Sequence, residues 1–210
     1  MKKSQIIPIN RIGFLVVGAL ALLCLSIAFK KIIRTGSSHE VVSSTIGLSA
    51  DNDTWSMRAD IPPVSGDFNF EGGELTRFQD FGFNVSAVQL VADDKVIEQS
   101  VQELLKQING QDISFKQGRV MILPVMKKVH VIGVLSLGAN KQVFPVQFDY
   151  KINPDRSINF SAHPDLFLSA FGIVIPDEKA ALIPDKLELT IDFTLSPMRS
   201  FLNRINAPSE

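Results

Sequence analysis

Several residue types that build common protein sites are scarce in this 210-residue chain. It has one cysteine, Cys24, which excludes an intrachain disulfide and leaves the redox compartment undetermined. A single tryptophan and a single tyrosine accompany 15 phenylalanines, so most of the aromatic surface carries no polar group. Hydrophobic residues make up 45% of the chain, which is ample for a sizeable core.

Catalytic and metal-binding patterns are also missing. The three histidines, His39, His130 and His163, have no second ligand at metal spacing. We interpret His39 as a linker residue, His130 as a polar residue on a strand face and His163 as part of a turn. No Gly-x-Ser-x-Gly turn, phosphate-binding loop or dinucleotide fingerprint occurs. The sequence therefore predicts no catalytic residue, metal site or cofactor, and a protein that is not an enzyme.

Positive charge is concentrated at the start of the chain. The first 34 residues contain six basic side chains and no acidic one, whereas the rest contains 15 basic and 22 acidic side chains, a net charge of −7. Nucleic-acid binding requires a basic face for the phosphates. The acidic domain therefore excludes nucleic acid as an expected partner.

The longest hydrophobic run, residues 12–29, predicts a membrane anchor. Its 18 uncharged residues form roughly 27 Å of helix, close to the thickness of the bilayer hydrocarbon. A cleaved signal peptide is the alternative, with Ser26 and Ala28 as the small residues before the cleavage site. The hydrophobic run is long for a signal peptide, however, and two lysines follow it. A lipoprotein signal at Cys24 is disfavoured because Leu23 is not small.

We expect a single-pass membrane protein whose domain is exported to the periplasmic side. Three basic residues precede the span and three follow it, so the charge balance does not set its orientation. The predicted organisation is an anchor over residues 1–34, a Ser-rich linker over 35–52, a β-domain over 53–196 and a tail over 197–210. In the tail, Ser196-Pro197 is typical of a helix start. The sequence predicts nothing about the oligomeric state.

Alternation of hydrophobic and polar residues predicts an antiparallel sheet. Its clearest part is a meander with strands over 129–137, 143–152 and 157–162, and the cleanest single strand is 186–195. Shorter strands are expected over 54–61, 66–70, 81–91, 113–115 and 119–125, with Pro124 at an edge or a bulge. Residues 93–108 have the period of an amphipathic helix, capped by Asp93 or Asp94 and ending near Gly110.

About eight antiparallel strands with one helix predict a barrel or a sandwich. Closure into a barrel removes exposed edges, and an eight-stranded barrel is wide enough for one elongated ligand. The aromatic residues on the inner face either line an apolar cavity or interdigitate as a packed core. The residues alone leave both interpretations open.

The chain resembles the YceI-like family of lipid- and polyisoprenoid-binding, lipocalin-like domains. The matching pieces occur in the family's order: GDFNF at 66–70, ISF at 113–115, VIGVLSL at 131–137 with Lys141 and the strand 143–148, and FGI at 171–173. The chain differs at Ala139-Asn140, where the family has Thr, at Ser169-Ala170, where Arg and Asp are common, and in the regular helix over 93–108. A membrane anchor is also not typical of the family.

The resemblance implies an antiparallel lipocalin-like barrel, exported to the periplasm, that holds an isoprenoid or another amphiphilic lipid. The predicted ligand-binding residues are Phe68, Phe70, Phe81, Phe83, Phe144, Val146, Phe148 and Phe160. A structural or interaction module with a filled core is the main alternative, and an enzyme of lipid metabolism is the second.

Overall fold

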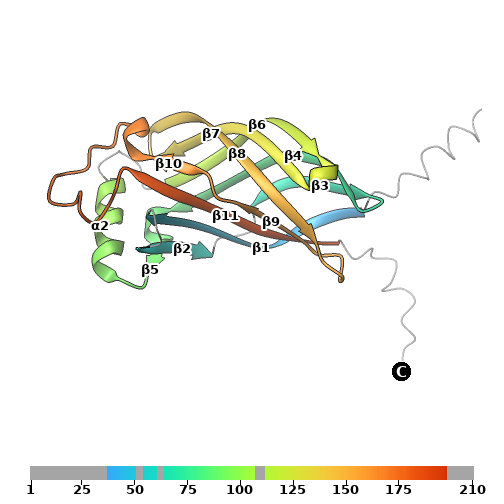
Figure 1. Cartoon of the computed structure of the whole chain (residues 1–210), viewed down its shortest axis with the longest axis horizontal. Helices are drawn as coiled ribbons and strands as arrows, with labels where there is room; N and C mark the ends of the chain where they lie inside the picture. Colours follow the sequence, from blue (N-terminus) through green and yellow to red (C-terminus); the bar gives the residue numbers. More distant parts are fainter. Residues whose placement is uncertain (1–36, 51–53, 61–63, 107–111, 198–210) are drawn as a thin grey trace, which may run out of the picture. The chain divides into compact units, whose positions relative to one another are not determined.

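Eight antiparallel strands form a closed barrel in this computed structural model, which describes residues 37–50, 54–60, 64–106 and 112–197 (Figure 1). The strand order around the barrel is β1, β11, β9, β8, β7, β6, β4 and β3. The ring closes because β1 pairs with β11 along most of its length and with β3 through three residues near its start. The predicted barrel is therefore confirmed.

The barrel strands are β1 (Ser37–Ala50), β3 (Ser65–Glu71), β4 (Glu74–Ser86), β6 (Asp112–Leu123), β7 (Lys128–Leu137), β8 (Asn140–Ile152), β9 (Ile158–Ala162) and β11 (Lys186–Pro197). Three short strands lie outside the ring: β2 (Ser56–Asp60), β5 (Val91–Ala92) and β10 (Asp165–Phe167). The helical elements are α2 (Lys95–Lys106) and the 3₁₀ turns η2 (Ala87–Gln89), η3 (Pro124–Met126) and η4 (Leu168–Phe171).

The helix α2 lies at the end of the barrel where β4 leaves and β6 enters (Figure 1). Asp94 Oδ1 accepts the backbone N–H of Val96 at 2.8 Å and so caps the helix start, as predicted. The apolar face of α2 is buried, and Lys179 bonds Glu103 on its outer face at 2.6 Å. The expected helix end at Gly110 lies outside the described residues.

The predicted linker over 35–52 is wrong across its described part, because Ser37–Ala50 is a barrel strand. Its serines concealed the alternation, since Ser44 takes an inward position in phase with Ile46 and Leu48, and Ser49 is buried on the opposite face of the strand. The Ser44 hydroxyl accepts the backbone N–H of Val64 at 3.0 Å, which satisfies that buried donor. His39 is consequently not a linker residue: it is buried in β1, with its ring centroid 4.8 Å from that of Phe70.

Three further boundaries differ from the sequence prediction. The segments 113–115 and 119–125 form one strand, β6, with a bulge between Gln117 and Arg119 that breaks the alternation. Pro124 begins η3, beyond the strand end. Ser196-Pro197 completes β11 and does not start a helix there, because it pairs with β1.

The N-terminal unit, residues 1–36, and the tail from residue 198 lie outside the described residues. The predicted span 12–29 therefore belongs to this undescribed part. Among the residues with described structure, no helix is long and apolar enough to cross a bilayer.

Candidate functional site

The barrel interior is a continuous cluster of aromatic side chains. All eight predicted ligand-binding residues are buried, with at most 8% of each exposed. Six of them belong to one network of ring contacts, with centroid distances from 4.7 to 6.5 Å: Phe68, Phe70, Phe81, Phe83, Phe148 and Phe160. Phe144 and Val146 are buried beyond this network. The predicted residues thus share one interior, and their role in binding stays a prediction.

Three phenylalanine rings of this cluster, and Tyr150, were missing from the predicted set of binding residues. Phe193 stacks on Phe160 at 4.7 Å and 3°, and its alternation in β11 could have identified it. Phe115 stacks on Phe83 at 6.0 Å. Phe78 lies three residues before Phe81, out of phase with the alternation, because the chain between them has a positive φ at Asp80 and a shifted register. No sequence signal marks that bulge.

The only described buried side-chain polar atom without a hydrogen-bond partner is the hydroxyl of Tyr150, which projects from β8 into the same interior. Burial raises the pKa of this hydroxyl, and the Glu74 carboxylate adds to the increase. The Leu75 backbone lies close enough to lower the pKa in part, but its geometry is not that of a hydrogen bond. The ammonium of Lys127 lies 5.6 Å from the ring centroid.

The barrel wall is incompletely paired along β8. Its thirteen residues pair with β7 over ten positions, but with β9 only between Asp149 and Ile152. From Val143 to Phe148, no backbone hydrogen bond to the facing segment 163–171 is found within the described chain. We refer to this unpaired stretch as the β8 gap.

Two prolines border the β8 gap. Tyr150 donates its backbone N–H to Lys127 O next to β7, so the even-numbered residues of β8 direct their backbone groups to β7. The odd-numbered residues direct theirs into the gap, and Pro145, one of them, has no N–H to offer. Pro164 lies on the opposite border, but its C=O accepts the backbone N–H of Leu189 in β11, so its backbone groups face away from the gap. A proline is tolerated in this strand because the gap requires no ladder bond at that position.

Two side chains bridge the gap at one end. The Asn140 amide donates to Phe171 O at 2.7 Å, and the Gln142 amide donates to Ala170 O at 2.8 Å. These bonds connect β8 to η4, where the neighbouring strand would otherwise pair. The wall is therefore held there by two neutral side-chain bonds and by no backbone ladder.

A groove of about 820 Å³ on the outer surface lies over the other part of the gap. This volume is within the range of about 300–1,000 Å³ that is usual for small-molecule sites. Its rim is formed by outward-facing side chains of β6 to β9, among them Arg119, His130 and Gln147. Its floor contains Val131, Val146 and Ala162, three buried residues. The full lining is Arg119, Val120, Met121, His130, Val131, Ile132, Pro145, Val146, Gln147, Asp149, Ser161, Ala162, His163 and Pro164.

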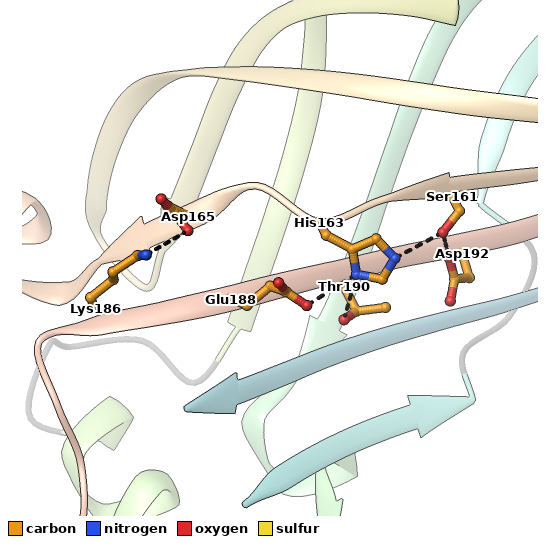
Figure 2. Close-up of polar contacts among 7 residues, drawn as sticks. All are labelled: Ser161, His163, Asp165, Lys186, Glu188, Thr190 and Asp192. Atoms are coloured by element: carbon orange, nitrogen blue, oxygen red, sulfur yellow. Dashed lines mark hydrogen bonds and ion pairs between the residues drawn. The ribbon is translucent and has the colours of Figure 1, made fainter. Parts of the chain in front are cut away.

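A chain of polar contacts lies on the border of the groove formed by β9 and β11 (Figure 2). Ser161 Oγ lies 3.0 Å from His163 Nε2 and 2.6 Å from Asp192 Oδ1. His163 Nδ1 lies 3.1 Å from Glu188 Oε1 and 3.4 Å from Thr190 Oγ1. The arrangement has the order of residues found in a Ser-His-acid triad.

The proton positions argue against an activated serine. A hydroxyl has one proton to donate, and a carboxylate can only accept. The 2.6 Å contact therefore assigns the Ser161 proton to Asp192, so His163 does not receive it. His163 is half exposed, and nothing encloses Ser161 as a reactive nucleophile would need. We interpret these contacts as a hydrogen-bonded rim that joins β9 to β11.

Within the described part of the chain, no group of three or more His, Cys, Asp or Glu side chains is arranged to hold a metal ion. His130 lies on the outward face of β7, in agreement with its predicted position on a strand face. His163 follows β9 directly and is exposed, as expected for a connecting residue.

No protein-family model matches this sequence, and no curated protein does. Solved structures do match. The Burkholderia cenocepacia protein BcnA is 12% identical, with 73% of this chain and 96% of that chain covered and a TM-score of 0.57. The Campylobacter jejuni YceI protein is 14% identical, with 65% of this chain and 82% of that chain covered and a TM-score of 0.52. A polyisoprenoid-binding domain from Saccharophagus degradans is 10% identical, with 77% of this chain and 99% of that chain covered and a TM-score of 0.49.

These likenesses concern the fold, because the identities are low. The predicted resemblance is confirmed at the level of the fold: the described domain has the barrel architecture of BcnA and the YceI protein.

Proposed function

We propose that the protein is a membrane-anchored, non-enzymatic module that binds a polyisoprenoid-like amphiphilic lipid, with the apolar chain of the lipid inside the barrel. The observation that carries this proposal is the interior itself. Rings from six strands form one apolar surface, and its continuation beside the β8 gap is lined by smaller side chains, Val131, Val146 and Ala162. The likeness to YceI-like proteins supports the same function.

The part of the interior beside Phe144 and Val146 is the position that we assign to the lipid chain. Elsewhere the rings already contact one another, so a ligand has to separate them. Near the gap, Phe144 stands apart from the ring network, and Ala162 leaves more room than an aromatic residue would. A lipid chain there would replace contacts among apolar side chains with contacts between those side chains and the lipid, at little cost in dispersion energy.

The filled core remains the main alternative function. In that case the same rings serve stability alone, and the domain is an interaction module held near a membrane. The stacking of Phe160 on Phe193 at 4.7 Å is the observation that favours it. The two functions differ in one measurable property, the retention of a lipid.

Native mass spectrometry of the full chain tests the proposal. The wild type is expected to carry an apolar ligand of constant mass, or to take one up from lipid vesicles. Phe144→Trp should lower the occupancy, because Phe144 is 8% exposed and faces inward. Val143→Trp is the matched control, since Val143 precedes Phe144 in the strand but its side chain is 73% exposed and faces outward. A wild-type chain that stays bare and takes up no lipid would establish the filled core.

The anchor and the export of the domain are part of the proposal. They are supported by the uncharged run of 18 residues at 12–29 and by the lysines and arginines that flank it. The intact mass of the purified protein distinguishes an anchor from a cleaved signal peptide. A reporter fused after residue 210 that is active only outside the cytoplasm tests the export. A cytoplasmic reporter signal would contradict the proposed topology.

A further inference from the structure

We propose that the β8 gap is a lateral portal, through which the apolar chain of a lipid enters the barrel from the groove on its outer face. This inference rests on the proposed lipid-binding function and adds a route to it. Three observations carry it: the missing backbone pairing along β8, the composition of the groove floor and the two side-chain bonds that bridge the gap.

The missing pairing weakens the described wall between β8 and segment 163–171. Paired barrel strands separate only when several backbone hydrogen bonds break together, whereas from Val143 to Phe148 no such bond crosses to this segment. Pro145 also removes a donor that could have formed one. Residues 74–81 of β4 are likewise unpaired with β6, but the Gln117 side chain bonds both Phe81 N and Phe78 O there, and the hollow over that stretch is lined mainly by polar groups.

Behind the groove, the residues of its floor turn their side chains to the barrel interior. Val131 and Val146 are paired across β7 and β8 and face inward together with the aromatic cluster. Both contribute to the groove floor, as does Ala162, and each of the three residues is at most 2% exposed. A lipid chain that passes from the groove between β8 and segment 163–171 therefore meets apolar side chains directly behind the strand.

The rim of the groove suits the polar end of an amphiphile. The side chains of Arg119 and His130 form no hydrogen bond or ion pair with other described residues. Arg119 offers five donors in a fixed fork, which favours an anionic or strongly hydrogen-bonding headgroup. The headgroup can remain in water at this rim while the chain passes inward.

An extended peptide is the other occupant that an unpaired strand edge could take. Pro145 argues against it. An added strand would find no N–H at Pro145, in the middle of the available edge, and prolines at edges protect sheets from such pairing. The lipid chain requires no backbone partner and is the occupant that the gap favours.

The test measures how fast a fluorescent long-chain acid, cis-parinaric acid, enters and leaves the full chain kept in a fluorinated surfactant. Gln147→Trp places a large outward-facing ring in the groove without changing the core. We expect its association and dissociation rates to fall together, by about tenfold, with the equilibrium affinity unchanged. Lys151→Trp is the matched control, because it lies on the same outward face of β8 where β9 is paired.

A second variant acts in the opposite direction. Asn140→Ala with Gln142→Ala removes both bonds that bridge the gap, and we expect both rates to rise by about tenfold if each bond contributes its usual net stability. Circular dichroism and thermal melting confirm that each variant is folded. Opposite changes in the two variants, with constant affinity, are the signature of a portal.

The outcomes separate the two proposals. Binding by the wild type with unchanged rates in both variants would overturn the portal and leave lipid binding intact. A weaker affinity of Gln147→Trp at unchanged rates of association would make the groove the ligand's final seat, which also overturns the portal. A wild type that takes up no probe would overturn lipid binding and the portal with it, and strand-like binding of a peptide to β8 would then identify the gap as a peptide site.

Discussion

Replacing Tyr150 by phenylalanine should stabilise the protein. The tyrosine hydroxyl is buried in the barrel and has no hydrogen-bond partner among the described groups, whereas in the unfolded chain it bonds to water. Leaving such a group unpaired costs about 1–3 kcal/mol. The Leu75 backbone nearby offsets part of this cost, so we expect Tyr150→Phe to raise the free energy of unfolding by about 1–2 kcal/mol.

Urea unfolding of the full chain, followed by circular dichroism, measures this difference. For a domain of this size each kcal/mol raises the melting temperature by about 2–4 °C, so thermal melting should show an increase of about 2–8 °C. The reciprocal variant Phe148→Tyr adds a hydroxyl to the same interior, where all its described neighbours are apolar rings. It should lower the free energy of unfolding by about 1–3 kcal/mol.

An unchanged or lower stability of Tyr150→Phe would refute this reasoning. It would mean that the hydroxyl has a partner, such as a buried water molecule or the polar group of a ligand. The two can be separated by lipid removal: a partner supplied by a ligand is lost on delipidation, and the stabilising effect of the substitution should then emerge.

Three further predictions concern the same barrel. Because burial raises the pKa of Tyr150, the unfolded state loses the hydroxyl proton at a lower pH than the folded state. The free energy of unfolding should therefore fall as the pH rises above about 10 and should be unaffected below it. Tyr150→Phe should remove this part of the pH dependence in urea titrations. Gly133→Ala should cost about 1–3 kcal/mol, because its Cβ would overlap the Phe115 ring and lie 2.5 Å from Lys116 O. Phe160→Ala should cost about 3–5 kcal/mol, whereas the exposed Val143→Ala should change the stability by less than about 0.5 kcal/mol in the same assay.

Regular alternation is the part of this fold that the sequence predicts well. The strands β7, β8, β9 and β11 each bury one face and expose the other, and their predicted ranges agree with the structure to within a few residues. β1 was not predicted because Ser44 occupies an inward position in it and Ser49 is buried on its other face. Such positions are recognisable only once their partners are known, as for the Ser44 hydroxyl, which bonds to Val64 N.

The structure also explains why two positions of the family motifs are glycine. A Cβ at Gly66 would overlap the ring of Phe68, and one at Gly133 would overlap the ring of Phe115. Glycine in a strand interior often marks such close approach of another group. The sequence shows the glycines, but the rings that lie over them come from the packing of the barrel, and in one case from a different strand.

The β8 gap could not be predicted, although one residue indicated it. Pro145 in the middle of a strand implies that one side of the strand needs no N–H at that position. Whether this side is an edge or the wall of a closed barrel depends on where β9 ends, which is at Ala162. The alternation across 157–162 does not reveal that the pairing of β9 with β8 stops at Asp149.

The same gap bears on the choice between a bound lipid and a filled core. A domain selected only for stability gains from pairing its wall completely, because each backbone hydrogen bond contributes about 0.5–1.5 kcal/mol net. In this barrel Val143–Phe148 of β8 have no strand partner on one side, beside the small inward-facing side chains of Val131, Val146 and Ala162. Residues 74–81 of β4 are also unpaired with β6, so missing pairing alone does not separate the two functions. A ligand that must enter and leave requires an unpaired stretch and small inner side chains at one place, and β8 combines the two.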